Sequence, residues 1–148
     1  MGRIMVIGPV GAGKSSLVRS LSERDEAVLK TQSLVFYGDF IDTPGEYTEN
    51  PLFYRSLMAT SQQASAVLLV QDATRRGIGF PPGFASGFPV PAAGAVTKLD
   101  APEADPDRAV ALLRQALPNG NIVQTSAITG IGISELRTLL ERLADRAK

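Results

Sequence analysis

Residues 8–15 read Gly8-Pro9-Val10-Gly11-Ala12-Gly13-Lys14-Ser15, and this stretch decides the fold because it fits the spacing Gly-x-x-x-x-Gly-Lys-Ser. The apolar run before it, residues 3–7, predicts a buried strand, and residues 16–21 after it predict the first turns of a helix. Glycines let the backbone curl so that successive N–H groups face one anionic centre, and the helix N-terminus adds partial positive charge. The stretch therefore predicts a loop that holds the phosphates of a nucleoside triphosphate.

Two side chains of this loop carry the expected chemistry. The Lys14 ammonium can reach the β- and γ-phosphates, and the Ser15 hydroxyl can ligate Mg²⁺. The simpler alternative is a glycine-rich turn capped by a serine, but the strand before the loop and the helix after it favour phosphate binding. We expect nucleotide contacts from the whole loop and from the residue that follows it, namely Gly8, Pro9, Val10, Gly11, Ala12, Gly13, Lys14, Ser15 and Ser16.

The composition excludes several kinds of chemistry. The 148-residue chain has no cysteine and no histidine, which excludes thiol nucleophiles, cysteine zinc sites and histidine triads. The net charge is zero, so nothing suggests a nucleic-acid partner. No apolar run approaches the roughly 18 residues of a membrane span. We expect a single nucleotide-binding domain, residues 1–148, located in the cytoplasm.

Strands and helices alternate along the chain, which predicts an α/β protein with the three-layer P-loop NTPase fold, a mainly parallel sheet flanked by helices. The uninterrupted apolar run 66–70 is typical of a strand covered on both faces. Further strands are expected at 33–37, 39–41, 92–96 and 121–124, with a tight turn at Gly38. Helices are expected at 14–23, 51–63, 106–117 and 132–147.

The segment 74–91 interrupts this alternation. It carries four glycines and four prolines among Phe80, Phe84 and Phe88, so a regular helix cannot run through it. Two interpretations stay open at this point. The segment either replaces the usual helix and packs on the sheet, or it presents its aromatic side chains to a partner. The nearby Arg75 and Arg76 are expected to lie in solvent.

Three short polar motifs follow predicted strands, at the edge where open α/β sheets bind ligands. In the first, residues 42–45, Asp42 can hold Mg²⁺ and the Gly45 N–H can touch a γ-phosphate. In the second, residues 97–100, the lysine stem can lie along a purine and the aspartate can accept two donors that guanine offers and adenine lacks. In the third, residues 125–127, backbone groups can meet guanine O6. The expected base contacts are Thr97, Lys98, Asp100, Ser126 and Ala127.

Each later motif alone is typical of a turn or a solvated loop, but their order along the chain resembles the first, third, fourth and fifth sequence boxes of the Era-like TRAFAC GTPases. Over nearly its whole length the chain resembles the ethanolamine/propanediol-utilisation P-loop family, EutP/PduV. The resemblance implies a nucleotide-binding protein associated with bacterial microcompartment pathways, and it indicates a pathway more than a reaction. It is carried by residues 3–9, Lys30-Thr31-Gln32, residues 41–47, Pro82-Gly83-Phe84 and residues 96–100.

The chain departs from the GTPase pattern at several positions. Thr97 stands where an asparagine usually ties the base box to the phosphate loop, so we expect modest base affinity. Glu46 occupies the position of the water-orienting glutamine, and a carboxylate there repels the γ-phosphate, which predicts slow hydrolysis. The alternative role for Glu46 is bracing a loop or capping a helix. Val10 would crowd an arginine supplied by a partner, and Thr31 is the best candidate for the threonine that contacts Mg²⁺, with a plain turn residue as the alternative.

These residues support two main hypotheses. The first is a guanine-nucleotide switch with slow Mg²⁺-dependent hydrolysis and a microcompartment shell or pathway protein as partner. The second is an ATPase or phosphotransferase that uses ATP on a small metabolite of the same pathway; a nucleotide-bound module without turnover is a third. Asp100 favours the first, because its carboxylate matches guanine and not adenine. The expected catalytic residues are Lys14 and Glu46, and the expected metal ligands are Ser15, Thr31 and Asp42.

Overall fold

A seven-stranded sheet forms the middle of the computed structural model, which describes residues 2–22, 29–31, 34–77 and 79–146. Its strand order is β2-β3-β4-β1-β5-β6-β7. The five neighbouring strands β4, β1, β5, β6 and β7 are parallel to one another, whereas β3 is antiparallel to both of its neighbours, β2 and β4. The strands are β1 Ile4–Ile7, β2 Leu29–Thr31, β3 Leu34–Tyr37, β4 Phe40–Asp42, β5 Ala66–Asp72, β6 Ala92–Thr97 and β7 Ile122–Gln124.

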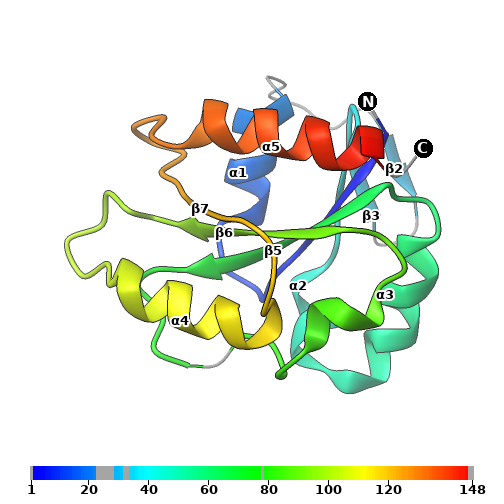
Figure 1. Cartoon of the computed structure of the whole chain (residues 1–148), viewed down its shortest axis with the longest axis horizontal. Helices are drawn as coiled ribbons and strands as arrows, with labels where there is room; N and C mark the ends of the chain where they lie inside the picture. Colours follow the sequence, from blue (N-terminus) through cyan, green and yellow to red (C-terminus); the bar gives the residue numbers. More distant parts are fainter. Residues whose placement is uncertain (1, 23–28, 32–33, 78, 147–148) are drawn as a thin grey trace.

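Helices cover both faces of this sheet and confirm the three-layer prediction (Figure 1). Helices α1 and α5 lie on one face, and α2, α3 and α4 lie on the other. Within the described residues, no helix combines the length and apolar character that crossing a bilayer requires. The helices are α1 Lys14–Ser22, α2 Gly45–Glu49, α3 Tyr54–Ser61, α4 Pro106–Ala116 and α5 Ile133–Arg146, with 3-10 turns η1 Pro51–Phe53 and η2 Phe84–Gly87.

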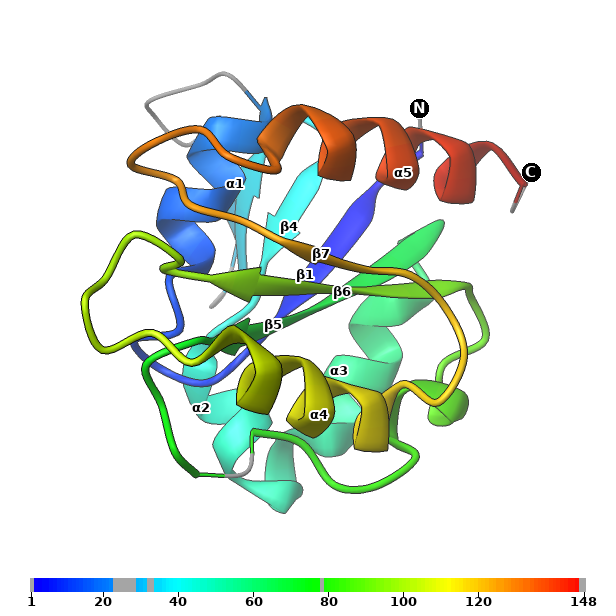
Figure 2. The same cartoon turned by 60° about the vertical axis from the view of Figure 1, so that its left-hand side comes forward.

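Helices cover the sheet on both faces (Figure 2), and the core has two halves because side chains alternate across each strand. Val6 and Leu68 point into the cluster beneath α1 and α5, whereas Met5 and Leu69 point into the cluster beneath α3 and α4. Every residue of β5 is buried, as the unbroken apolar run predicts for a central parallel strand. The site edge of the sheet is therefore held rigidly from both sides.

Two short elements were not predicted. The helix expected at 51–63 is observed as the turn η1 followed directly by α3, but the separate helix α2 before it was not expected. Asn50 and Pro51 separate α2 from η1: the Asn50 side chain accepts a hydrogen bond from Leu52 N, and Pro51 has no N–H to continue a helix. The strand β2 was not expected. It pairs with β3 through Lys30 and Val35, so the antiparallel region has one strand more than the sequence pattern indicates.

The segment 74–91 packs on the sheet, which decides between its two interpretations. Phe80 and Phe88 are buried in the same cluster as Leu69, and the Phe84 ring contacts both, at centroid distances of 5.4 and 5.3 Å. Arg75 remains partly in solvent, with its side chain 41% exposed, although its guanidinium donates to the Val10 carbonyl at 3.4 Å and lies 3.6 Å from a Glu49 oxygen. Arg76 is exposed as expected.

Candidate functional site

The phosphate loop joins β1 to α1, as its flanking sequence predicts. Gly11 and Gly13 have φ angles of 80° and 90°, a conformation that residues with a Cβ rarely adopt. The Ala12 N–H donates to the Pro9 carbonyl at 3.1 Å and closes the turn. Lys14 begins α1, and the first N–H groups of a helix have no acceptor within the helix. The loop thus presents backbone donors together with the positive end of a helix dipole.

Lys14 is held in this loop as a cation with few protein partners. Its side chain is buried, and Nζ donates to the Pro9 carbonyl at 3.3 Å. Burial lowers the pKa of Lys14, while the charges of Asp42, Glu46 and Glu49 act in the opposite direction. Burial removes water from around the ammonium, and a bound phosphate beside it would supply the negative charge that stabilises its protonated form. Lys14 therefore suits the phosphate contact expected of it.

Ser15 and Asp42 meet at the carboxyl ends of the strands. Ser15 Oγ donates to Asp42 Oδ2 at 2.8 Å. Burial raises the pKa of Asp42 above its usual value, although the hydrogen bond from Ser15 and the charge of Lys14 act in the opposite direction. Within the described residues, the buried Asp42 Oδ1 has no hydrogen-bond partner. A Mg²⁺ ion or its water would complete this oxygen, so the donor set fits the metal.

The protein alone does not build a complete metal cage. Across the part of the chain that the structure describes, no group of three or more acidic, histidine or cysteine side chains gathers at one point. A cation at Ser15 and Asp42 would therefore draw its other ligands from water and from phosphate oxygens. This is the usual arrangement for Mg²⁺ bound together with a nucleotide.

The metal role predicted for Thr31 stays a prediction. The Thr31 backbone ends β2 and pairs with Leu34, and on the next strand Val35 pairs with Asp42. Thr31 thus lies at the same edge of the sheet as Asp42, two strands away, which corresponds to about 10 Å between backbones.

The γ-phosphate side of the site is a hollow of about 300 Å³ that Lys14, Ser15 and Asp42 line together with the N-terminus of α2. Gly45, the first residue of α2, packs directly on Val10: a Cβ at position 45 would overlap the Val10 backbone. Only glycine fits there. Glu46 also lines this hollow and is exposed, and its backbone carbonyl accepts from Asn50 N, so the structure places this carboxylate beside the phosphate loop with its charge in solvent.

The base side of the site is fastened to the phosphate loop by two side chains. Thr97 Oγ1 donates to the Ala12 carbonyl at 2.6 Å, so the threonine makes a tie to the loop although it replaces an asparagine. The hydroxyl reaches a loop carbonyl directly, and the modest base affinity expected from this replacement stays a prediction. Lys98 Nζ donates to the Gly11 carbonyl at 2.8 Å and, at the same distance, to Asp72 Oδ2.

Asp72 is a site residue that the sequence analysis missed. It ends β5, it is buried, and Oδ1 accepts from both Thr74 N and Thr74 Oγ1, at 2.8 and 2.6 Å. Burial by itself raises the pKa of Asp72, but the bonds from Lys98 and Thr74 outweigh it, so the pKa lies below its usual value. Lys98 has a φ of 65°, unusual for a residue with a side chain, and the Asp72 pair holds it in that conformation. The position of Asp72 after a central strand was the available signal.

Asp100 and Ser126 meet from two separate loops. Ser126 Oγ donates to Asp100 Oδ1 at 2.7 Å, which orients the carboxylate. Around them lies a second hollow of about 300 Å³, between the phosphate loop and the base motifs. Thr97, Lys98 and Ala127 line it, with Leu17 as an apolar wall. Of the expected base contacts, Thr97, Lys98, Asp100 and Ala127 line this hollow, whereas Ser126 is buried and reaches it only through its bond to Asp100.

The sequence matches a known family. The profile described as "Ethanolamine utilisation - propanediol utilisation" (PduV-EutP) matches residues 1–142. The chain is 37% identical over 139 residues to "Propanediol utilization protein PduV" of Citrobacter freundii, covering 92% of this chain and 91% of that protein. It is also 37% identical over 120 residues to "Probable acetate kinase EutP" of Salmonella typhimurium, covering 79% and 72%.

The fold is also found in solved structures of other proteins. The G-domain of FeoB from Methanococcus jannaschii superposes with a TM-score of 0.63 at 21% identity, covering 98% of this chain and 99% of that chain. The bacterial selenocysteine-specific elongation factor EF-Sec gives a TM-score of 0.67 at 24% identity; the match covers 99% of this chain but 29% of that chain. At these identities the likeness establishes the fold alone. The family match and the relatives go further: the chain belongs to the PduV-EutP family of ethanolamine and propanediol utilisation.

Proposed function

We propose that this chain is a Mg²⁺-dependent guanine-nucleotide switch that hydrolyses GTP slowly and serves ethanolamine or propanediol utilisation. One observation carries the proposal. The Asp100 carboxylate is oriented by Ser126 at the mouth of a purine-sized hollow, and the adjacent Lys98 is fixed to the phosphate loop. A carboxylate accepts from the paired N–H donors of guanine, whereas the corresponding edge of adenine has no such pair.

The expectation of slow hydrolysis rests on the charges around the γ-phosphate position. Lys14 is the only cation among the described residues that line this hollow, and the acidic Asp42 and Glu46 line it too. Phosphoryl transfer depends on cations that neutralise charge developing on the transferred group. With one lysine, one bound Mg²⁺ and a nearby Glu46, turnover is expected to be slow unless a partner supplies a further cation.

The second candidate is an ATP-dependent phosphotransferase that acts on a small metabolite of the same pathway. It is favoured by the name of a relative, since the 37%-identical Salmonella typhimurium protein is called a probable acetate kinase. The phosphate loop and the Ser15–Asp42 pair would serve either reaction, because both bind phosphates and Mg²⁺ without contacting the base.

Nucleotide competition separates the two candidates. The purified protein is first loaded with a fluorescent GTP analogue in the presence of Mg²⁺. Unlabelled GTP, GDP, ATP and ADP are then compared, one at a time, for how well each displaces this analogue. The switch predicts that GTP and GDP displace the probe at least about 100-fold more effectively than the adenine nucleotides. Equal displacement by ATP, together with acetyl phosphate formed from ATP and acetate, would replace the switch by the phosphotransferase.

We place the protein in the cytoplasm and propose a microcompartment shell or pathway protein as its partner. The support is the family match, which links the chain to these pathways. Imaging of a fluorescent fusion in cells that form microcompartments tests this placement. A nucleotide-dependent change from a diffuse to a punctate distribution supports it, and a diffuse signal under all conditions counts against it.

A further inference from the structure

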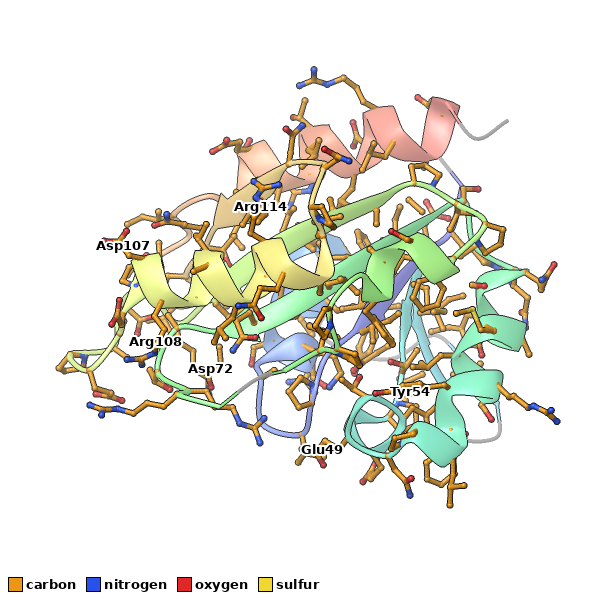
Figure 3. The ribbon with its side chains drawn as sticks, turned by 60° about the horizontal axis from the view of Figure 1, so that its bottom comes forward. Glu49, Tyr54, Asp72, Asp107, Arg108 and Arg114 are labelled. Carbon is orange, nitrogen blue, oxygen red and sulfur yellow. The ribbon has the colours of Figure 1, made fainter. Side chains whose placement is uncertain are left out.

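Arg75 is anchored at the end of a central strand and reaches across to the phosphate loop. Its backbone N–H donates to the Asp72 carbonyl at 3.2 Å, in a turn that Thr74 fastens by donating twice to the Asp72 carboxylate. From this turn the guanidinium donates to the Val10 carbonyl at 3.4 Å and lies 3.6 Å from Glu49 Oε1. Figure 3 shows Asp72 at the end of β5 and Glu49 at the end of α2, both in the lower part of the view. One side chain therefore connects β5, the phosphate loop and α2.

This contact places the guanidinium beside the γ-phosphate side of the site. Val10 lines the hollow on that side, and Gly45 at the start of α2 packs directly on Val10. Arg75 also lines an open hollow of about 550 Å³, together with Pro9 and Glu49. The side chain therefore has room to change its conformation next to the loop residues that would hold the γ-phosphate.

Glu49 holds Arg75 only weakly. Both side chains are 41% exposed, and exposed ion pairs contribute little to stability. The charge of Glu49 also reaches the phosphate loop, where it acts to raise the pKa of Lys14. A triphosphate on the same loop would bring oxygens that accept charge-assisted hydrogen bonds from a guanidinium. These oxygens can therefore replace Glu49 as the partner of Arg75.

The γ-phosphate side of the site has few cations for the proposed reaction. Lys14 is the only cation among the described residues that line this hollow, and Asp42 and Glu46 are acidic. The Val10 side chain is 53% exposed, so it would crowd an arginine that a partner supplied from outside. Arg75 reaches the same residue from within the chain, through the Val10 backbone carbonyl. The chain thus carries its own arginine at a position that a partner's arginine would reach only past Val10.

We propose that Arg75 is a catalytic residue of GTP hydrolysis, which leaves Glu49 to contact the γ-phosphate. The inference rests on the proposed function. In this reaction the oxygen of a water molecule bonds to the γ-phosphorus, and the bond from this phosphorus to the β–γ bridging oxygen breaks. GDP leaves with the electron pair of that bond, while one proton of the water stays on the inorganic phosphate and the other passes to solvent. Arg75 would neutralise the charge that develops on these oxygens, and Glu49 would hold it away between turnovers.

The first test is single-turnover hydrolysis by the full-length protein, measured as phosphate release from a preformed GTP complex at saturating Mg²⁺. Arg75→Ala should slow this step by at least about tenfold. GDP affinity should stay unchanged, because GDP has no γ-phosphate. Arg75→Lys keeps the charge without the planar fork, so it should recover only part of the rate. The control is Arg76→Ala, which removes the exposed neighbouring arginine and should change neither quantity.

A second measurement does not depend on turnover. Aluminium fluoride bound beside GDP mimics the phosphoryl group during transfer, and its affinity can be titrated by fluorescence with a labelled GDP. Arg75→Ala should weaken aluminium fluoride binding by at least about tenfold while GDP binds as before. A merely structural role for Arg75 would instead weaken GDP and the aluminium fluoride complex alike, and that result would overturn the proposal. This titration also decides the question if hydrolysis by the parent protein is too slow to measure.

Glu49→Gln should have the opposite effect. It removes the carboxylate that competes for Arg75, so hydrolysis should become about two- to fivefold faster. Loss of folding cannot imitate a gain in rate, which protects the test against unstable variants. The gain should disappear when Glu49→Gln is combined with Arg75→Ala, because no arginine is then released. Glu141→Gln, which removes an exposed carboxylate on α5, is the matched control.

Failure of this inference can be told apart from failure of the proposed function. If the parent protein binds neither GTP nor GDP, the nucleotide titration alone overturns both. If guanine nucleotides bind and Arg75→Ala hydrolyses GTP and binds aluminium fluoride as the parent does, the switch stands and Arg75 is not catalytic. An equal gain from Glu49→Gln with and without Arg75 would overturn the role assigned to the Arg75–Glu49 pair.

Discussion

The two ends of the nucleotide site differ in how firmly they are built. At the base end, Thr97 and Lys98 bond to the phosphate loop, and Ser126 orients Asp100. At the γ-phosphate end, Glu46 is exposed and the α2 helix has only five residues. If the proposed function is correct, the prebuilt base end would select the nucleotide, and the short α2 helix would be the part that responds to the γ-phosphate. This division is what the proposed switch requires.

The largest expected effect concerns the loop that both ends share. Lys14→Ala should abolish measurable triphosphate binding, at least about 100-fold, because the buried ammonium is the phosphate charge partner. Titration with a fluorescent GTP analogue measures this, with the exposed Arg142→Ala as the control. Ser15→Ala should weaken binding mainly when Mg²⁺ is present, which a parallel titration in EDTA reveals. Unchanged affinity in Lys14→Ala would exclude a phosphate-binding loop.

The next effect tests the base end alone. Asp100→Asn should lose about 3 kcal/mol of GTP binding, because two charge-assisted hydrogen bonds are replaced by a mismatch. The same variant should gain affinity for xanthosine triphosphate, whose edge has the reversed pattern. Competition binding with both nucleotides measures the exchange, and the exposed Glu103→Gln serves as its control. A variant that loses GTP without gaining xanthosine triphosphate would argue that Asp100 is structural.

The substitution Asp72→Asn tests whether the buried Asp72 carboxylate is needed to hold Lys98 in place at the base end of the site. The change breaks the 2.8 Å pair with Lys98, so GTP affinity should fall about tenfold and unfolding free energy at pH 7 by about 1–2 kcal/mol. The expected loss of unfolding free energy is this small because the Lys98 side chain is 40% exposed, and solvent weakens its ion pair with Asp72.

The contribution of the Asp72–Lys98 pair to stability should depend on pH, and the same variant tests the direction of that dependence. The pKa of Asp72 is lowered on folding, from a usual value of 3.8. Its contribution is therefore present above pH 3.8 and is lost as pH falls through the lower folded value. Urea unfolding at pH 7 and at pH 3 should give a smaller difference between parent and variant at the acidic pH. A difference that does not shrink would show that the ion pair contributes nothing. Asp145→Asn, on the exposed side of α5, is the control.

The smallest effect is expected at the γ-phosphate end. Glu46→Gln keeps the shape and removes the charge, so GTP affinity should stay equal or improve. Single-turnover hydrolysis should change by about tenfold or less, because turnover is limited by a missing cation more than by a missing base. Phosphate release from a preformed complex at saturating Mg²⁺ measures the rate. A hundredfold loss would identify Glu46 as the catalytic carboxylate and the protein as a dedicated enzyme.

Sequence reasoning predicted the fold and the parts of the site that local motifs encode. The glycines of the loop have a distinctive spacing, whereas Asp42 and the Lys98–Asp100 motif were identified from their order along the chain and their positions after predicted strands. Asp72 was missed because its role depends on β5 lying beside β6, which no local pattern expresses. The short helix α2 was missed for another reason, because its separation from the helix predicted at 51–63 depends on the side-chain cap at Asn50.

The phenylalanine-rich segment between β5 and β6 has a consequence for how the protein opens. A helix in this place would carry its own ladder of hydrogen bonds. The middle of the described segment is instead attached largely by ring burial and by the backbone bond from Gly83 N to Gln115 O, and its ends are tied by bonds such as Val67 N to Pro91 O. Releasing Phe80 and Phe88 costs about 2–3 kcal/mol each, less than unfolding the whole domain. The segment can therefore detach as a local unit, and its amide hydrogens should exchange with solvent long before those of β5, which exchange only when the sheet itself unfolds.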